Sequence, residues 1–431
     1  MPIRMTTHAP DFAERFRGFL SAKRELSEDV SAAARAIVAD VIARGDAALV
    51  ALSRRFDRVD LNAIGLRVSA DEIERATHDC DTDSLEALGL AKARIEAYHR
   101  RQVPANDRFV DALGAELGLR WTAIEAVGVY VPGGTAAYPS SVLMNTVPAK
   151  VAGVRRIVMT VPVPDGRLNP LVLAAARLAG VDEVYRIGGA QAIAALAYGT
   201  ATIKPVAKIV GPGNAYVAAA KRLVFGTVGI DMIAGPSEVL IVADGTSQPD
   251  WIAADLMAQA EHDPAAQAIL ITDDPLLADA VEVAVDVALK SLPRESVAGA
   301  AWREFGAIIV VGRLEEAVAL VDAIAPEHLE IASREPERIA DGVRNAGAIF
   351  LGPHTPEAIG DYVAGSNHVL PTARSARFSS GLGVTDFMKR SSILKLAPDA
   401  LAALGPAAIT LARAEGLEAH ARSVAIRLNR Q

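Results

Sequence analysis

Cysteine is nearly absent from this 431-residue chain, which contains only Cys80. A single cysteine cannot form a disulfide within the chain, so the sequence predicts a protein of the reducing cytoplasm. Long apolar runs are also missing: 51% of the residues are hydrophobic, but no run of about 18 uninterrupted apolar residues could span a bilayer. The first residues lack the apolar core of a signal peptide. We therefore expect a cytoplasmic protein with no membrane partner.

Positive charge is not concentrated anywhere in the sequence. The formal net charge is -8 and no block of Lys and Arg stands out, which argues against a nucleic-acid partner. The usual dinucleotide fingerprint, Gly-x-Gly-x-x-Gly, is missing as well. The chain is long enough for two to three domains of about 150 residues each, with a sizeable core. Small molecules are the expected partners.

Short apolar strands alternate with helical segments through the middle of the chain. From Val127 the order strand, glycine turn, helix is repeated several times, and a second such series begins at Val239. This alternation is typical of parallel α/β domains. The glycine turns follow Val131, Ile187 and Val210, where free backbone N–H groups at a helix start suit an anionic ligand such as a pyrophosphate. On pattern alone, a nucleotide site and plain tight turns are equally good interpretations.

Simpler patterns flank these two series. Residues 27–55 form a helical stretch with a break at Gly45, and residues 69–72 have the spacing of a capping box. Residues 117–121 alternate as in a strand. After about residue 379 the pattern is helical only, so we expect a helical tail.

One helix carries polar side chains at its inward-facing end. Residues 250–263 are predicted to form a helix that stops before Pro264. Its inward stripe is apolar through Leu256 and then presents Gln259, with His262 close behind. Buried polar groups need partners. Either both side chains bond to neighbouring backbone, which is the commoner situation, or they bind a metal whose other ligands come from elsewhere.

Further histidines and carboxylates gather late in the chain. Glu327 and His328 are adjacent in an expected loop before a short apolar strand. Such a pair offers one group that takes a proton and another that orients or activates water, although a solvated loop with an incidental pair is the plainer interpretation. Asp361 and His368 belong to a second expected loop, which is flanked by glycines.

A third polar cluster lies in the tail. Glu415 and His420 would face different sides of one unbroken helix, but Gly416 is expected to end a helix between them and let both face one site. A set suited to zinc then comprises Gln259, His262, Asp361 and His420. Spacing alone does not exclude four neighbours of this set as metal ligands: Glu261, Asp263, His354 and Glu418.

Ten segments in this order carry a resemblance to the histidinol dehydrogenases. They run from about residue 125 to 420, and the first 120 residues contribute little to the resemblance. The segments are Val129–Thr135, Tyr138–Met144, Gly188–Ala194, Ile209–Val217, Asp231–Leu240, Ala258–His262, Ala325–Glu330, Gly360–Tyr362, Asn367–Thr372 and Glu415–His420.

The resemblance implies an activity and a role for each candidate residue. Family members oxidise L-histidinol to L-histidine in two NAD-dependent steps through a bound aldehyde, the last step of histidine biosynthesis. One zinc ion per subunit would be held by Gln259, His262, Asp361 and His420. The acid/base residues would be Glu327 and His328. The substrate would contact Ser237, Gln259, His262, His328, Asp361, His368, Glu415 and His420. The NAD site would be lined by Tyr130, Gln191 and Asn214.

The resemblance also implies an architecture. The fold class is α/β, with two incomplete Rossmann-like parallel domains of the aldehyde-dehydrogenase-like kind and small N-terminal and helical C-terminal appendages. The protein would be an intertwined homodimer in which each C-terminal tail completes the partner's site. The expected parts are an N-terminal appendage (1–24), a helical part packing with the second α/β domain (25–125), a first Rossmann-like domain on the NAD side (126–235), a second one with the zinc and catalytic loops (236–378), and a helical dimerisation tail (379–431).

Three other functions are compatible with the same residues. A relative that oxidises a different polar alcohol could keep zinc, NAD and the pair Glu327–His328. A zinc hydrolase would use Glu327 to activate water and would leave the glycine turns without a ligand. A non-catalytic metal- or nucleotide-binding protein would tolerate replacement of both Glu327 and His328.

Overall fold

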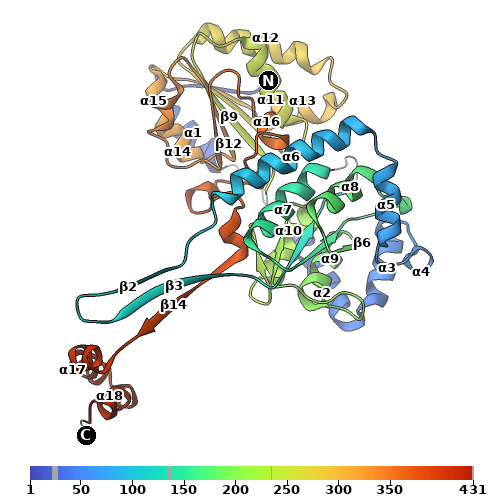
Figure 1. Cartoon of the computed structure of the whole chain (residues 1–431). Helices are drawn as coiled ribbons and strands as arrows, with labels where there is room; N and C mark the ends of the chain where they lie inside the picture. The colour runs from blue at the N-terminus through green and yellow to red at the C-terminus, as the bar shows by residue number, and fades with distance from the viewer. Residues whose placement is uncertain (22–27, 134–137, 234, 430–431) are drawn as a thin grey trace.

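The structure is a computed structural model that describes residues 1–21, 28–133, 138–233 and 235–429. Two parallel α/β domains lie one above the other, and a long arm projects from them (Figure 1). This arrangement confirms the expected α/β fold class. Parts of four expectations lie outside the described residues: the helix start at Ser27, the turn at Gly134, the motif end at Thr135, and Ala234.

The first domain is built on a five-stranded parallel sheet with the order β6-β5-β4-β7-β8. Its strands are β4 (Ala126–Tyr130), β5 (Arg156–Thr160), β6 (Glu183–Tyr185), β7 (Lys208–Val210) and β8 (Gly229–Ile230). Its helices are α7 (Pro139–Ala152), α8 (Pro170–Ala179), α9 (Gly189–Tyr198) and α10 (Ala215–Val224). Every residue of β4 is buried, as expected for a central parallel strand covered by helices on both faces.

The N-terminal helices cover this first sheet. They are α2 (Glu28–Arg44), α3 (Asp46–Phe56), α4 (Leu61–Ile64), α5 (Ala70–His78) and α6 (Thr82–Arg100). Gly45 separates α2 from α3 at φ 54°, and Ser69 and Glu72 form the predicted capping box. Apolar residues of α2 and α3 share a core with α9 and α10, and those of α6 share one with α7. The expectation that residues 25–125 pack with the second α/β domain is therefore wrong, because their apolar faces match the helices of the first.

The second domain is built on a six-stranded parallel sheet with the order β1-β11-β10-β9-β12-β13. Its strands are β1 (Ile3–Thr6), β9 (Glu238–Ala243), β10 (Gln267–Thr272), β11 (Ala307–Val310), β12 (His328–Ala332) and β13 (Ala348–Leu351). Its helices are α1 (Phe12–Ser21), α11 (Pro249–Ala260), α12 (Pro275–Leu289), α13 (Glu295–Phe305), α14 (Ala317–Ile324), α15 (Pro336–Ala340) and α16 (Glu357–Tyr362). The segment expected to be an N-terminal appendage thus contributes the edge strand β1.

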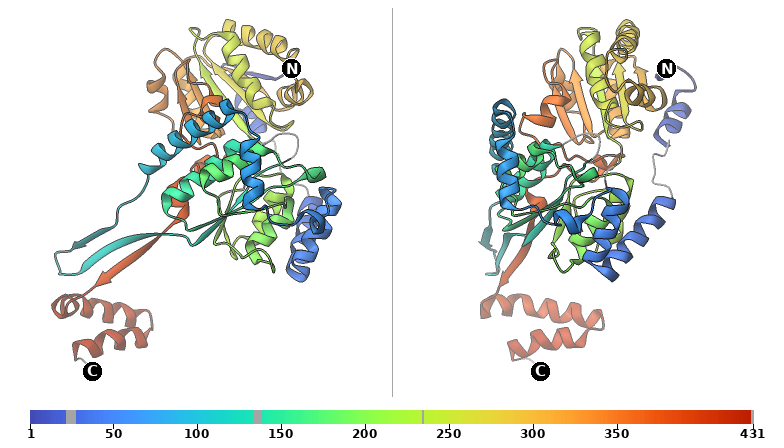
Figure 2. Two further views of the ribbon diagram at one scale, coloured as in Figure 1. Left: turned by 45° about the vertical axis from the view of Figure 1, so that its right-hand side comes forward. Right: turned by 90° about the vertical axis from the view of Figure 1, so that its right-hand side faces the viewer.

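The arm consists of a three-stranded antiparallel sheet followed by two helices. The strands are β2 (Asp107–Val110), β3 (Glu116–Ala123) and β14 (Met388–Lys395), and the helices are α17 (Pro398–Ala414) and α18 (Glu418–Ala425). Short 3-10 turns occur at Pro164–Gly166, Leu314–Glu316, Ser375–Arg377, Val384–Phe387 and Ile426–Leu428. In two further views the arm leaves the body of the molecule and ends in α17 and α18 (Figure 2).

Strand β14 corrects one prediction. The tail after residue 379 is not helical only, because Met388–Lys395 pairs along its whole length with β3. Most residues of β14 are exposed, so the strand lacks the alternation of apolar and polar residues that identifies a half-buried strand. Pairing with a distant segment, rather than local pattern, makes this segment a strand.

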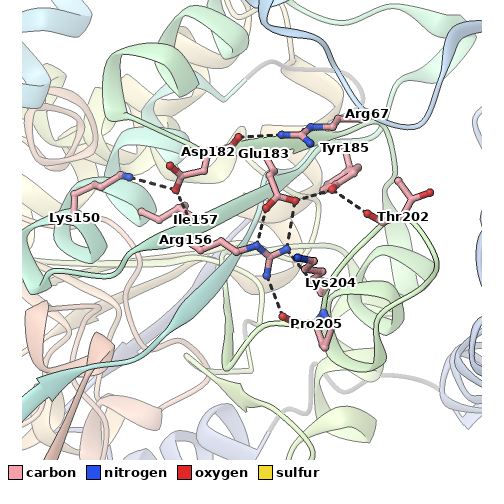
Figure 3. Close-up of polar contacts among 10 residues, drawn as sticks. All are labelled: Arg67, Lys150, Arg156, Ile157, Asp182, Glu183, Tyr185, Thr202, Lys204 and Pro205. Atoms are coloured by element: carbon pink, nitrogen blue, oxygen red, sulfur yellow. Dashed lines mark hydrogen bonds and ion pairs between the residues drawn. The ribbon is translucent and has the colours of Figure 1, made fainter.

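A polar network ties together the amino ends of the strands in the first sheet (Figure 3). The guanidinium of Arg156 donates to both carboxylate oxygens of Glu183, at 2.6 and 3.3 Å, and to the carbonyl oxygens of Lys204 and Pro205. The hydroxyl of Tyr185 donates to Glu183 at 2.7 Å. Burial, followed by the neighbouring carboxylate, raises the pKa of Tyr185 to about 12. The network therefore joins β5, β6 and the loop before β7.

We expect Arg156→Met to lower the free energy of unfolding by about 2–3 kcal/mol, because it leaves the largely buried Glu183 carboxylate without its charge partner. The control is Arg177→Met, whose ion pair with Glu74 spans 3.6 Å between side chains that are at least half exposed. Such a surface pair contributes only about 0–1 kcal/mol. Urea denaturation of both variants measures the difference, and equal losses would contradict the structural role of the network.

Among the described residues, none of the helices combines the length and hydropathy needed for a bilayer span.

Candidate active site

Two neighbouring interior strands of the second sheet, β9 and β12, begin side by side at the edge turned toward the first domain. Glu238 is the first residue of β9 and His328 the first residue of β12, and the register pairs His328 with Val239. His328 is therefore a strand residue, not the loop residue predicted, while Glu327 lies just before the strand. Because both strands have a neighbour on each side, the side chains at this edge are buried: Glu238, Glu327 and His328 are 2%, 6% and 4% exposed.

Hydrogen bonding assigns the protons on His328. Its Nδ1 lies 3.0 Å from the carbonyl oxygen of Glu238, and a carbonyl can only accept, so Nδ1 carries the proton. Burial lowers the pKa of His328 to about 4, against the opposing charge of Asp361. The ring is therefore neutral at pH 7. Its Nε2 has no hydrogen-bond partner among the described residues, which leaves a buried lone pair able to accept a proton.

Glu327 is held beside this ring. One carboxylate oxygen accepts a hydrogen bond from the backbone N–H of Glu238 at 2.9 Å and lies 3.7 Å from Nδ1 of His328. The predicted acid/base pair therefore shares one anchor, the main chain of Glu238. This common support fixes the relative positions of carboxylate and imidazole.

Asp361 and His368 complete the same cluster. Asp361 lies on α16, not in the predicted loop, and its Oδ1 is 4.0 Å from Nε2 of His328. Nδ1 of His368 is 3.1 Å from the backbone oxygen of Asp361, and its Nε2 is 3.4 Å from Oγ of Ser141 on α7. Burial also lowers the pKa of His368. Side chains from both domains therefore meet at this site.

Helix α11 ends earlier than predicted. It closes at Ala260, so Gln259 stands in its last turn while His262 and Asp263 follow in an exposed turn. Gln259 is buried, and its Oε1 has no hydrogen-bond partner among the described residues. His262 is close enough for its charge to lower the pKa values of His328 and His368. His262 therefore lies near the cluster that contains Asp361, and α11, which carries Gln259, packs against α16.

Sequence reasoning missed one member of the cluster, Glu357. It is 2% exposed, its Oε1 lies 4.0 Å from Nδ1 of His328, and with His328 and Asp361 it forms a group whose ligand atoms all lie within 4.8 Å. Burial and the charge of Asp361 raise the pKa of Glu357 well above its ordinary value. A signal was available, since Glu357 precedes Asp361 by four residues and so shares its face of α16.

Two further carboxyl groups, those of Glu330 and Asp255, lie next to Glu357. Glu330 follows His328 on the same face of β12, accepts a hydrogen bond from the backbone N–H of Glu357 at 2.6 Å, and bonds to the side chain of Asp255 on α11. Burial, followed by the charge of Asp255, raises the pKa of Glu330, and burial raises that of Asp255 to about 6. The pair therefore retains a proton and anchors the first residue of α16.

This pair predicts a specific pH dependence of stability. Because the pKa of Asp255 is higher in the folded than in the unfolded protein, its contribution is fully present below about pH 4 and is lost as the pH rises through about 6. We expect Asp255→Asn to remove part of this loss, so that the variant gains about 1 kcal/mol on the parent between pH 5 and pH 8, after allowance for partial exposure.

Urea denaturation at the two pH values measures this gain. The control, Asp250→Asn, changes an exposed carboxylate in the first turn of the same helix. A gain of the same size in the control, or none in Asp255→Asn, would contradict the shared proton.

The residues predicted to line the NAD site lie at the carboxyl edge of the first sheet. Tyr130 ends β4, and its buried hydroxyl accepts a hydrogen bond from the backbone N–H of Gly189 at 3.1 Å. Gln191 is buried in the first turns of α9. The side chain of Asn214 accepts from two backbone N–H groups and caps α10. The three residues therefore stand at the ends of β4, β6 and β7, although Asn214 also has a structural role.

One turn at this edge requires glycine. Gly211 has φ 109°, and a Cβ there would lie 2.1 Å from the carbonyl oxygen of Tyr130. Sequence reasoning missed the ion pair that holds this turn, formed by the fully buried side chains of Lys221 and Asp231. Lys221 donates to the carbonyl of Gly211 at 3.1 Å, and Asp231 accepts from the Gly211 N–H at 2.8 Å.

Two predicted site residues are not brought to the cluster within one chain. Glu415 follows α17 and His420 lies on α18, and both are exposed. These helices stand at the end of the arm, away from both domains (Figure 1). Gly416 does end a helix between the two residues, at φ 74°, as predicted.

Fold and site together define a two-domain α/β enzyme, with glycine turns at the carboxyl edge of one parallel sheet and a buried histidine–carboxylate centre on the other. The family model for histidinol dehydrogenase matches residues 20–428. The chain belongs to the histidinol dehydrogenase family. It is accordingly an NAD-dependent oxidoreductase of histidine biosynthesis.

Individual relatives are similar to this protein along its whole length. A histidinol dehydrogenase of Bradyrhizobium diazoefficiens is 70% identical over 429 residues, and one of Rhodopseudomonas palustris is 69% identical over 431, with 100% of both chains covered in each case. A crystal structure of histidinol dehydrogenase from Elizabethkingia anophelis is 35% identical, with a TM-score of 0.95 over 99% of this chain and 98% of that one. A different polar alcohol as substrate is not favoured by these relatives.

Proposed function

We propose that the protein oxidises L-histidinol to L-histidine through L-histidinaldehyde, consuming two NAD per histidinol and holding one zinc ion per subunit. The observation that carries the proposal is the buried cluster around His328. It combines a neutral imidazole, whose Nε2 has no hydrogen-bond partner among the described residues, with the adjacent carboxylate of Glu327 and the carboxylate of Asp361 on α16. A dehydrogenase that removes hydride twice needs a proton acceptor at each oxidation and a way to hydrate the aldehyde between them.

The residues present suit a zinc ion. Gln259 contributes a buried amide oxygen with no partner among the described residues, which is the kind of atom that a metal would satisfy. His262 and Asp361 add a nitrogen and a carboxylate, and His420 would be the fourth ligand, giving an N2O2 set. When bound, zinc would hold the imidazole and amine of the substrate and so position it.

His328 would take the proton of the substrate alcohol on Nε2, since Nδ1 is committed to the carbonyl oxygen of Glu238. Glu327 would take a proton from the water that hydrates the aldehyde. NAD supplies the hydride acceptor in both oxidations, at the edge lined by Tyr130, Gln191 and Asn214. Ser237, His368 and Glu415 would contact the substrate.

We propose further that the active form is a homodimer in which the tail of one copy completes the site of the other. Within one chain the arm exposes large apolar side chains at its strands and helices: Phe109, Val110, Leu394, Leu411 and Ile426 are each more than half exposed. Exposed apolar surface of this kind marks an interaction site. A symmetric pair of copies would bury it and bring Glu415 and His420 to the partner's cluster.

The test is the amount of NADH formed per histidinol consumed, with purified zinc-loaded protein, excess NAD and limiting L-histidinol. We expect two NADH per histidinol, loss of activity with a chelator, and recovery with zinc. One NADH per histidinol would indicate that the aldehyde is released unoxidised. No NADH from protein shown to bind zinc and NAD would contradict the proposed substrate.

A further inference from the structure

A cavity lies at the edge of the six-stranded sheet opposite to the histidine–carboxylate cluster. It has a volume of about 480 Å³ and begins where β9, β10 and β12 end. Its lining includes Asp244, Asp273, Arg313, Ser333, Arg334 and Arg338. The histidine–carboxylate cluster is at the other end of the same strands, so the six residues of β9 separate the two places by roughly 17 Å at about 3.3 Å per residue.

The cavity occupies the position where parallel sheets bind ligands. In the order β1-β11-β10-β9-β12-β13 the direction of winding reverses between β9 and β12. Ligands of open α/β sheets bind outside the carboxyl ends of the strands at such a reversal. Asp244 follows β9 and Ser333 follows β12, so both line the cavity at the switch point itself.

Ser333 provides an independent sign of a ligand. The residue is only 6% exposed, it lines the cavity, and its Oγ has no hydrogen-bond partner among the described residues. A buried hydroxyl without a partner is unfavourable unless another molecule satisfies it. The Ser333 hydroxyl is therefore available to form a hydrogen bond with a ligand in the cavity.

The charged side chains around the cavity are only partly paired. Asp244 accepts from the backbone N–H of Arg334 at 2.8 Å, and Arg338 donates to Glu315 at 2.9 Å. The guanidinium of Arg334 forms no direct ion pair with another described residue, although its charge lowers the pKa of Asp244, and the carboxylate of Asp273 forms no such pair either. Burial, followed by neighbouring carboxylates, raises the pKa of Asp273. Of the other charged residues in the lining, Arg313 lies 3.9 Å from Glu316 and Glu335 lies 3.7 Å from Arg338. Arg334 and Asp273 are thus the cation and the hydrogen-bond-accepting carboxylate that remain for a ligand.

We propose that this cavity binds a ribonucleoside phosphate. Ribose hydroxyls donate to a carboxylate such as Asp273, and a phosphate accepts from the guanidinium of Arg334 and the hydroxyl of Ser333. Asp273 directly follows β10, the second strand of this series, and an acidic residue contacts the ribose in nucleotide-binding sheets of this plan.

The volume of the cavity favours a ribonucleoside phosphate over smaller ligands. Cavities of about 300–1,000 Å³ hold ligands of nucleotide size, whereas a free amino acid or inorganic phosphate would leave most of the space empty. Inorganic phosphate would also offer Asp273 only like charge. The proposal does not depend on the dehydrogenase activity, because the two places share no residue.

Equilibrium dialysis with ADP tests the proposal on the purified full chain. We expect Arg334→Gln and Asp273→Asn each to remove one bound ADP per chain or to raise its Kd at least tenfold. The control Arg303→Gln removes the same charge from an exposed position on α13, outside the cavity, and should bind ADP as the parent does. NADH formation from histidinol should be unchanged in all three variants.

Several outcomes would overturn the proposal. ADP that binds at the first sheet would give the same stoichiometry and Kd in Arg334→Gln and Asp273→Asn as in the parent. Competition by inorganic phosphate as strong as that by AMP would reduce the cavity to an anion site without ribose recognition. Dialysis with NAD in place of ADP distinguishes the source, because a second bound NAD per chain would identify its ADP half as the ligand.

Discussion

We expect His328→Asn to lower kcat for both oxidations by about 10²–10⁴-fold, the usual contribution of a positioned general base. The structure gives the reason. Nδ1 of His328 donates to the carbonyl of Glu238, burial keeps the ring neutral, and Nε2 is the buried atom left to accept a proton. Asparagine can occupy the position but cannot take up a proton. Single-turnover assays that start from L-histidinol and from L-histidinaldehyde measure the two oxidations separately.

Glu327→Gln should differ in its pattern. Glutamine can keep the hydrogen bond from the Glu238 N–H, so the site stays in place, but it cannot accept a proton from water. We therefore expect the aldehyde step to slow much more than the alcohol step. The control is His354→Asn, which alters an exposed histidine whose ring contacts Trp251. If the His328→Asn and Glu327→Gln variants oxidised histidinol at the parent's rate, the acid/base assignment would be wrong.

A mixed dimer should recover activity that its two parents have lost. We expect His420→Ala alone to lower kcat at least about 100-fold, because the proposed fourth metal ligand is removed. Dimers of one His328→Asn chain and one His420→Ala chain should nevertheless show about half the parent's kcat per dimer. If each tail serves its partner, one site of the mixed dimer carries both substitutions and the other carries neither.

The two single-variant homodimers are the controls for this experiment, and differently tagged chains allow the mixed dimer to be purified. Were the tail to act on its own chain, every site of the mixed dimer would carry one substitution and no activity would return. Glu415 and His420 are exposed and belong to the segment of α17 and α18. These helices stand at the end of the arm (Figure 2), which favours recovery.

Several features of this protein follow from local sequence. Gly45 ends α2 because a residue at φ 54° is easiest for glycine, and Ser69 with Glu72 starts α5 through a capping box. The alternation of apolar strands with helices predicts parallel sheets, since parallel strands need crossover connections. Motifs such as Ala258–His262 and Ala325–Glu330 identify the family, because long identical segments in one order do not arise from helix or strand pattern alone.

Other features depend on contacts between distant residues, and sequence reasoning missed them or placed them wrongly. Asp361 lies on α16 instead of in a loop, because the first residue of that helix is anchored by Glu330 on β12. Helix α11 stops at Ala260, so His262 lies in the turn that follows it. The packing of residues 25–125 on the first domain required the shapes of both apolar faces.

By itself, then, the sequence determined the class of fold, the family, and the types of side chain that carry the chemistry, because these follow from hydrophobic period, glycine and cap positions, and motif order. Only the tertiary structure decided the protonation of His328 and the inclusion of Glu357 in the cluster. The tertiary structure also determined that residues 388–395 form the strand β14 and that a cavity lies at the carboxyl ends of β9 and β12. The physical reason is that burial, pairing and pKa depend on which segments meet in space, and no local pattern encodes that meeting.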